Sequence, residues 1–344
     1  MKTIEIIRNS VMQCIEKIEA LLKRISKTEE TVEEQGNKIK DGMVSLSVME
    51  NFASSQFANF TYLYYEENGE IKSMLFNDGN VSQPLIDSYV ISGKPLSYIC
   101  WDRTQKVEFK NFDTSAVTNM SSMFNGCGNL TSLDVTNFNT SAVTDMGGMF
   151  NGCNRLTSLD VTHFDTSSVT SMGFMFYNCQ MLKALDVTNF NTSSVTRMDR
   201  MFYECRSLTT LDLTKFNTSA VTDMESMFYL CKNLKTLDLS NFDMSAITNA
   251  LNMFFYCTSL TSIIGTHTLE EVQAGTVKAM RGLKVNISFS DSPNLERASI
   301  LALFYGLADL TGQTAQTVTL HATAKARLTA EDIKIATDKN WNVS

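Results

Sequence analysis

Proline, glycine and histidine are scarce in this sequence, and basic residues are outnumbered by acidic ones. The chain has 3 prolines and 16 glycines among 344 residues, which excludes a collagen-like chain and a low-complexity disordered one. A formal net charge of -8 argues against a nucleic-acid partner, because binding to phosphates depends on a basic face. The hydrophobic content of 43% is enough for a sizeable core. We therefore expect a folded, acidic protein that binds no nucleic acid.

Long apolar runs are also missing. A membrane span needs roughly 18 to 20 apolar residues, and the nearest candidate, residues 298–310, is shorter and contains Asp309. The N-terminus carries a charged or amide side chain every few residues, unlike the apolar stretch of a secretory signal. We expect a protein that is made in a cytoplasm, without an export signal and without membrane insertion.

Motifs of catalysis and metal binding are absent as well. The chain has three histidines, His163, His267 and His321, and lacks a glycine-rich phosphate loop, a G-x-S-x-G elbow and an H-E-x-x-H motif. None of the eight cysteines forms a C-x-x-C pair, so reduced thiols are expected. A cysteine–histidine nucleophile is the only conceivable catalytic pair, and buried small hydrophobic side chains are the favoured interpretation of the cysteines. We predict no enzymatic activity, no cofactor and no metal site.

Residues 1–41 carry a heptad pattern that predicts a coiled-coil stalk. An apolar repeat sustained over more than five heptads drives a left-handed supercoil, because only supercoiling keeps the seam facing its partner. Apolar Ile15 and Leu22 beside the seam, with polar Thr28 and Gln35 within it, favour a parallel trimer over a dimer. The alternative is a single amphipathic helix packed on its own domain. The apolar seam residues expected to hold the homotrimer together are Ile4, Ile7, Val11, Cys14, Ile18, Leu21, Ile25, Val32 and Ile39.

Residues 42–100 contain short apolar and aromatic runs separated by turn signals. Asn68 and Gly69 divide two strand-like stretches, and Asn-Gly suits a tight hairpin turn because both residues tolerate positive φ. We predict a small β-rich connector, which also caps the N-terminal end of the next segment.

A repeat of 26 residues organises residues 101–264. Phenylalanine recurs at this period from Phe112 to Phe242, and cysteine from Cys127 to Cys257. A partial unit precedes the full ones. Self-similarity at a fixed period is typical of architectures in which each unit stacks on the next.

One unit, residues 138–163, reads FNTSAVTDMGGMFNGCNRLTSLDVTH. Its middle part predicts a short helix with Thr144 as N-cap, because apolar side chains follow the i, i+3, i+4, i+7 spacing of one helix face. Those side chains are Met146, Met149, Phe150 and Cys153. Residues 156–161 then follow the L-x-x-L-x-L pattern of a strand whose alternate residues point into the core.

A unit with one apolar helix face and one apolar strand face cannot bury both by itself. Neighbouring units must therefore stack, and we predict an α/β fold: a leucine-rich-repeat solenoid of six full turns over residues 101–264, with a parallel sheet on one side. Residues 265–344 read as helix, strand and helix, and we expect them to form an α/β cap on the C-terminal end of the solenoid.

One candidate binding surface is a row of aspartates at equivalent strand positions. Their spacing of about 4.8 Å on a sheet would place like charges side by side, which predicts raised pKa values or bound cations. The alternatives are a surface for cations or sugar hydroxyls and a purely structural ladder held by threonine and backbone hydrogen bonds. The row comprises Asp134, Asp160, Asp186, Asp212 and Asp238.

A second candidate surface is a row of aromatic residues at an exposed position of successive repeats. Aromatic rings on a polar face can stack on sugar rings or pack against another protein. The alternative is packing between adjacent repeats. The row comprises Tyr177, Tyr203, Tyr229 and Phe255. Beside it lies a position that varies freely and is occupied by Ser122, Gly148, Phe174, Arg200, Ser226 and Asn252, of which Phe174 joins the candidate surface.

The repeat unit FDTSxVTxMxxMFxxCxxLxxLDxT resembles the BspA-like (DUF285) leucine-rich repeat over roughly Trp101 to Ile264. That resemblance implies a kinship with bacterial cell-surface adhesins. The segment from Asn294 to Trp341 is similar to the C-terminal segments of such repeat proteins in gut bacteria and their phages.

Together these features suggest a trimeric fibre component of a bacteriophage that infects gut bacteria, on either its tail or its head. In this hypothesis the N-terminus binds other virion proteins, and the repeats recognise a polysaccharide or protein on the host cell surface. The protein would be made in the host cytoplasm and reside in the virion. The alternative is a bacterial surface adhesin, or a cellular leucine-rich-repeat scaffold that binds partner proteins.

Overall fold

The computed structural model describes residues 60–67, 70–77, 85–86, 89–90, 106–109, 112–115 and 117–344, with side chains for residues 114, 115 and 117–344. The coiled coil predicted for residues 1–41, with all its seam residues, lies outside the described residues. The described residues 61–63, 74–77 and those from 85 onward belong to one compact unit, and the repeats described below lie within it.

Short strands precede the regular repeats. Strands β1 (Phe60–Glu67) and β2 (Glu70–Asn77) pair with each other on either side of the predicted Asn68-Gly69 turn. The other strands of this region are β3 (Leu85–Ile86), β4 (Tyr89–Val90), β5 (Lys106–Phe109), β6 (Phe112–Asp113) and β7 (Ser132–Leu133). Parallel pairing joins β3 to β5, β5 to β7 and β4 to β6. The β5–β7 register places Val107 opposite Leu133, which is one repeat period later.

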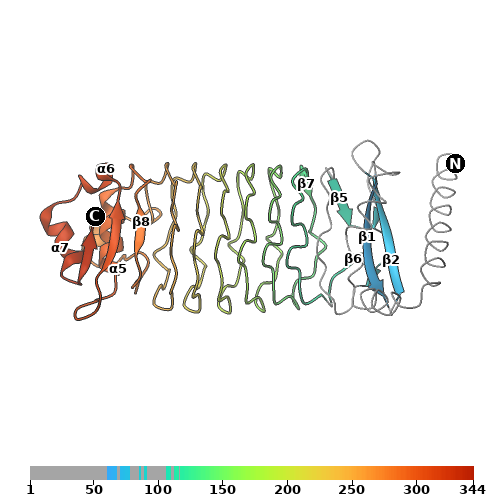
Figure 1. Ribbon diagram of the computed structural model, residues 1–344, viewed down its shortest axis with the longest axis horizontal. Helices are drawn as coiled ribbons and strands as arrows, with labels where there is room; N and C mark the ends of the chain where they lie inside the picture. Colours follow the sequence, from blue (N-terminus) through green and yellow to red (C-terminus); the bar gives the residue numbers. More distant parts are fainter. Residues whose placement is uncertain are drawn as a thin grey trace, which may run out of the picture. The chain divides into compact units, whose positions relative to one another are not determined.

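Successive repeats lie side by side in parallel register, which Figure 1 shows as a series of evenly spaced turns. The sheet itself is fragmentary: after β7, residues 134–264 make isolated bridges, such as Thr210 to Thr236, instead of continuous strands. A second line of parallel bridges joins Asn119, Asp145, Ser171, Arg197, Asp223 and Asn249, each to the next.

The short helix predicted in each repeat is wrong. Residues 117–264 contain no α-helix, and residues 147–152 form a chain of turns. Backbone N–H groups donate alternately in two directions: that of Met149 donates to the Met146 carbonyl in the same repeat (3.2 Å), and that of Phe150 donates to the Met175 carbonyl in the next repeat (2.9 Å). Gly148 and Gly152 have φ of 63° and 76°. These left-handed residues bend the chain every four positions and prevent a continuous i→i−4 ladder.

Thr144 therefore caps no helix. Its N–H and its hydroxyl both donate to the Thr118 carbonyl, at 2.8 and 3.1 Å. The same pair of hydrogen bonds recurs one repeat after another, as far as Thr248 and the Thr222 carbonyl. This threonine row is thus a ladder of hydrogen bonds between repeats. The N–H and hydroxyl groups that would cap a helix within one repeat bind the preceding repeat instead.

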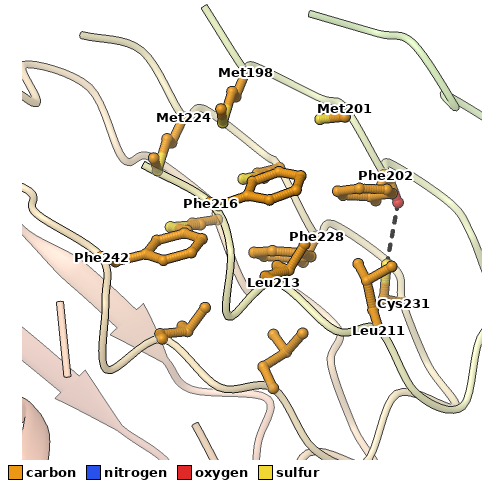
Figure 2. Close-up of a cluster of buried hydrophobic side chains, with 14 of the residues drawn as sticks. Met198, Met201, Phe202, Leu211, Leu213, Phe216, Met224, Phe228, Cys231 and Phe242 are labelled. Atoms are coloured by element: carbon orange, nitrogen blue, oxygen red, sulfur yellow. Dashed lines mark hydrogen bonds between the residues drawn. The ribbon is translucent and has the colours of Figure 1, made fainter. Parts of the chain in front are cut away.

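The inward rows are buried as predicted. Met146, Met149, Phe150 and Cys153 are all 0% exposed. Their phenylalanine row forms a column in which consecutive ring centroids lie 5.5 to 5.8 Å apart. Figure 2 shows Phe202 and Phe228 of this column among inward methionine and leucine side chains. Each repeat therefore contributes the same apolar set to a core that runs from unit to unit.

The cysteine row is part of the same core. Cys153, Cys179, Cys205, Cys231 and Cys257 are free and buried. The thiol of Cys231 donates to the Phe202 carbonyl at 3.1 Å (Figure 2), which links it to the preceding repeat. Burial raises the pKa of Cys179 and Cys231 to about 12, so both thiols are protonated at neutral pH and cannot serve as nucleophiles. The prediction that all cysteines are reduced is wrong for Cys127, which is disulfide-bonded.

A further row of buried threonines was not anticipated from the sequence. The hydroxyl of Thr166 donates to the Asn191 carbonyl at 3.0 Å and accepts from the Asn191 N–H at 2.8 Å. Thr166 is 1% exposed. One side chain thereby satisfies both backbone groups of a residue in the next repeat, which a buried turn requires. Its equivalents are Thr114, Thr140, Thr192 and Thr218.

Replacing Thr166 by valine is expected to lower the free energy of unfolding by about 1–2 kcal/mol, because the Asn191 N–H and carbonyl lose their partner. Urea unfolding of the full chain measures the change. Thr166→Ser keeps the hydroxyl and serves as the control. Equal stability of the valine variant and the native protein would show that these hydrogen bonds do not hold the repeats together.

The C-terminal segment adds the only α-helices among the described residues and a small parallel sheet. The sheet has the order β10-β9-β8, with β8 (Ile287–Phe289), β9 (Gln316–Leu320) and β10 (Trp341–Val343). The helices are α4 (Leu269–Gln273), α5 (Arg297–Gly306), α6 (Ala322–Lys325) and α7 (Ala330–Thr337). The ring of Phe289 in β8 stacks on Phe254 at 4.6 Å, so the phenylalanine column continues into this sheet.

Two polar contacts hold the C-terminal helices in place. Arg297 donates to both carboxylate oxygens of Asp332 at 2.8 and 2.7 Å, which ties α5 to α7. The ammonium of Lys339 donates to the carbonyls of Phe304, Tyr305 and Leu307, each at 3.0 Å, and so satisfies the end of α5. The longest described helix, α5, has 10 residues, and none of the helices in the described part of the chain could cross a bilayer.

Candidate binding surfaces

A shallow depression of about 570 Å³ lies over three successive repeats on the side that carries the predicted strands. Its small, exposed floor residues are Ser158, Ala184 and Thr210. Its lining includes three members of the aspartate row, Asp160, Asp186 and Asp212. The structure thus brings these predicted residues together on one face.

Each of these aspartates is engaged by a threonine two residues later. Oδ1 of Asp186 accepts from the Thr188 N–H at 3.0 Å and from the Thr188 hydroxyl at 2.6 Å. Asp134, Asp160 and Asp212 make the same pair of bonds with the threonines that follow them. Asp238 accepts from the Ser240 N–H at 3.0 Å. The alternative of a ladder held by threonine and backbone hydrogen bonds matches this geometry.

The raised pKa values expected for this row are wrong for four of its members. Hydrogen bonds from the side chain and backbone of the following threonine lower the pKa of Asp134, Asp160, Asp186 and Asp212. Repulsion from a neighbouring aspartate acts in the opposite direction on the pKa of Asp186, but its effect is the smaller one. The local bonds prevail because they are short and direct, whereas the repulsion crosses water-exposed space.

Replacing Thr188 by valine is expected to raise the pKa of Asp186 toward its ordinary value, because the hydroxyl bond is lost. Carboxyl chemical shifts followed by NMR across pH 2 to 6 measure this pKa. Thr188→Ser retains the hydroxyl and should leave the pKa depressed. An unchanged Asp186 pKa in the valine variant would mean that another contact depresses it.

Within residues 117–344 no three histidine, cysteine, aspartate or glutamate side chains gather closely enough to hold a metal ion. One carboxylate oxygen of each aspartate in the row accepts hydrogen bonds from the residue two positions later. The other oxygen can accept a hydrogen bond from a ligand.

The aromatic row lies on a different side of the repeats and stacks upon itself. Ring centroids are 4.5 Å apart between Tyr177 and Tyr203, and 4.4 Å between Tyr203 and Tyr229, with interplanar angles of 8° and 1°. Phe255 extends the stack at 5.0 Å from Tyr229. Burial and the neighbouring tyrosines raise the pKa of Tyr203 to about 12. Neighbours cover both faces of the Tyr203 ring, so this row matches packing between repeats, and its ring edges and hydroxyls remain for a ligand.

Phe174 lies beside this stack in an unusual setting. Its φ is 61°, and its ring lies 5.5 Å from Tyr177. The Arg200 guanidinium lies 5.2 Å from the centroid of the Phe174 ring, a cation–π contact. Arg200 also pairs with Glu225 in the next repeat. The freely varying position, to which Phe174 belongs, has a positive φ in every described repeat. Gly148 is the one residue at this position whose type indicates a left-handed conformation from sequence.

A second depression, of about 260 Å³, adjoins Phe174. It spans four repeats in a region where two glycines, Gly147 and Gly173, replace the larger side chains of later repeats. Polar groups from the bridged row line it: Asp145, Ser171 and Arg197. The sequence does not predict this site, because its residues come from four different positions of the repeat, none of which forms a motif.

The charged cluster at one end of this depression is self-contained. Asp199 is 1% exposed and accepts from Arg197 Nε at 3.1 Å and from its terminal nitrogen at 3.2 Å. Arg200 approaches the same carboxylate at 3.6 Å. Because the buried charge is paired, Arg197 is held in a fixed orientation while its side chain remains 56% exposed.

Comparison with known proteins identifies the family of the repeats. A family model described as Mycoplasma protein of unknown function, DUF285, matches residues 96–186 and 180–288, which together make up more than half of the chain. No curated protein and no solved structure matches the chain. The expected resemblance of the repeat unit is confirmed, and the chain belongs to the DUF285 family of repeat proteins.

Proposed function

We propose that this protein is a trimeric fibre component of a bacteriophage, on its tail or its head, which binds a polysaccharide or protein on the surface of its host cell. It acts as a structural and binding protein, not as an enzyme. It is made in the host cytoplasm and becomes part of the virion, where its N-terminal segment attaches to other virion proteins.

The observation that carries this proposal is the contrast between an invariant core and a varied surface within one chain. Inward methionine, phenylalanine and cysteine rows repeat with little change and are buried. At the partly exposed position of the bridged row, by contrast, Asp145, Ser171 and Arg197 follow one another in successive repeats. Repeat proteins use such surfaces for binding, because the core tolerates substitution of the outer residues.

The architecture in this proposal is a leucine-rich-repeat solenoid over residues 101–264, capped by residues 265–344 and carried on a trimeric coiled coil over residues 1–41. The side-by-side repeats and their single continuous core support the solenoid. Three copies of the binding surface on one stalk would strengthen a weak contact, because the second and third contacts form at high effective concentration.

The family description names Mycoplasma, which supports a bacterial protein as the second candidate. A bacterial surface adhesin, or a cellular scaffold that binds partner proteins through its repeats, would use the same surfaces.

Two measurements test the proposal. Mass spectrometry of purified phage particles, produced from bacteria that encode this chain, should detect its peptides in the particle. The purified full chain should bind host cells or their isolated surface polysaccharide in a pull-down assay. Recovery of the chain from bacterial envelopes, with none in particles, would overturn the fibre proposal and support the adhesin.

A further inference from the structure

We propose that the second depression, next to Phe174, is a binding site for one neutral sugar unit of a surface polysaccharide. This inference rests on the proposed function, since it names the ligand and the place of binding. The argument comes from the floor, the polar lining and the aromatic wall of the depression.

The floor is open because two positions lack side chains. Neither Gly147 nor Gly173 is in the left-handed region, so the backbone conformation does not demand glycine there. A Cβ at Gly147 would lie 3.0 Å from Asp145 Oδ1 and 3.4 Å from Ser171 Oγ, and both of those residues line the depression. A Cβ at Gly173 would meet Asp199 Oδ1 at 2.7 Å. The two glycines thus keep the floor open and leave room for the buried Asp199.

The polar lining matches sugar hydroxyls. Asp145, Ser171 and Arg197 occupy consecutive places in a row of parallel bridges, so they are spaced by about 4.8 Å from one repeat to the next. A carboxylate only accepts hydrogen bonds, a guanidinium only donates them, and the nearby Asn151 amide does both. Neighbouring sugar hydroxyls each donate and accept, so they need this mixture.

The charges of the lining favour a neutral ligand. Asp145 and Arg197 carry opposite charges, and Arg197 is also neutralised by Asp199. The first depression differs in this respect: it places three carboxylates together, and they provide acceptors only.

Phe174 supplies the apolar wall. The Arg200 guanidinium contacts the ring from 5.2 Å, and the half-buried side chain lines the depression. An aromatic side chain beside convergent polar groups is the arrangement that binds the C–H face of a sugar while the hydroxyls are hydrogen-bonded. The volume of about 260 Å³ lies below that of typical drug-sized pockets, which start at about 300 Å³, and suits a single sugar unit.

The test is Gly148→Arg in the full chain. Residue 148 has φ of 63°, and Arg200 occupies the equivalent position at 55°, so the backbone accepts arginine there. The long side chain should fill the depression. Asn252→Arg is the matched control, because residue 252 has φ of 57° and is exposed in a repeat outside the depression. Phe174→Ser, which copies Ser122 of an earlier repeat, removes the apolar wall instead of filling the floor.

Saturation-transfer NMR with glucose, galactose, mannose, rhamnose and N-acetylglucosamine provides the readout. At least one of these sugars should receive saturation from the native chain. Gly148→Arg and Phe174→Ser should each raise its dissociation constant by about tenfold or more, whereas Asn252→Arg should leave it unchanged. No transfer to any of the five sugars, or equal transfer in the native and Gly148→Arg proteins, overturns the inference.

Host-cell binding separates this inference from the function on which it rests. If the native chain binds cells and Gly148→Arg binds them equally well, the depression is not the site and the proposed function stands. If the native chain binds no cells but the sugar signal depends on residue 148, the depression is a sugar site and the proposed function fails.

Discussion

Replacing Phe202 by alanine is expected to lower the free energy of unfolding by about 3–5 kcal/mol. The side chain is 0% exposed and stacks between Phe176 and Phe228, at 5.7 and 5.8 Å. Its removal leaves a cavity that the neighbouring repeats cannot close, because the hydrogen bonds between their turns fix the spacing. The core therefore loses both the buried area and the contacts of the ring.

Urea unfolding followed by circular dichroism measures this loss. Tyr203→Ala is the control, because Tyr203 also stacks between two rings but is half-buried. Its loss should cost clearly less than that of Phe202. Equal losses for the two variants would mean that ring stacking, and not burial in the shared core, determines the stability of the column.

Replacing Asp332 by alanine is expected to cost about 2–3 kcal/mol of stability, because the partner Arg297 stays partly buried without its counter-charge. The Asp332 side chain is 7% exposed, and that of Arg297 is 31% exposed. Asp332 also accepts from the Thr329 N–H at 2.8 Å and so completes the capping box of α7. Asp338→Ala is the control: the Lys334–Asp338 pair is an exposed ion pair, and its loss should cost no more than about 0.5 kcal/mol.

The contribution of Asp332 should depend on pH in one direction. Hydrogen bonds from Arg297 lower the pKa of Asp332 in the folded protein. Its stabilising effect is then fully present above the unfolded pKa of about 3.9 and disappears as the pH falls through the lower folded value. The stability difference between the native protein and Asp332→Ala should accordingly be constant near neutral pH and shrink in acid. A difference that grows on acidification would contradict this assignment.

The inward side of the repeats could be predicted from sequence because burial depends on spacing. Met146, Met149, Phe150 and Cys153 are buried although the segment is not helical. A turn every four residues places apolar side chains on the same side as a helix of similar period would. The pattern alone therefore cannot distinguish the two. Glycine at positions 148 and 152 indicates the left-handed turns. Other repeats have Phe174, Arg200 and Leu230 at these positions, which adopt the same left-handed conformation without indicating it from sequence.

The candidate surfaces could be predicted only in part. The aspartate and aromatic rows lie where their period places them, but their energetics depend on neighbours that a single repeat does not reveal. Thr188, two residues after Asp186, fixes the carboxylate and lowers its pKa. The second depression depends on which residues face one another across repeats, such as Gly173 and Asp199. That information appears only once the register between repeats is known.

The solution mass of the full chain tests the central claim, a trimeric fibre, most directly. Multi-angle light scattering of the native protein should give three times the chain mass of 38.4 kDa. A variant with Ile18→Glu and Ile25→Glu should give a single chain mass, because the proposed coiled coil would have to bury two charges in its seam. A native protein that is already monomeric would contradict the account.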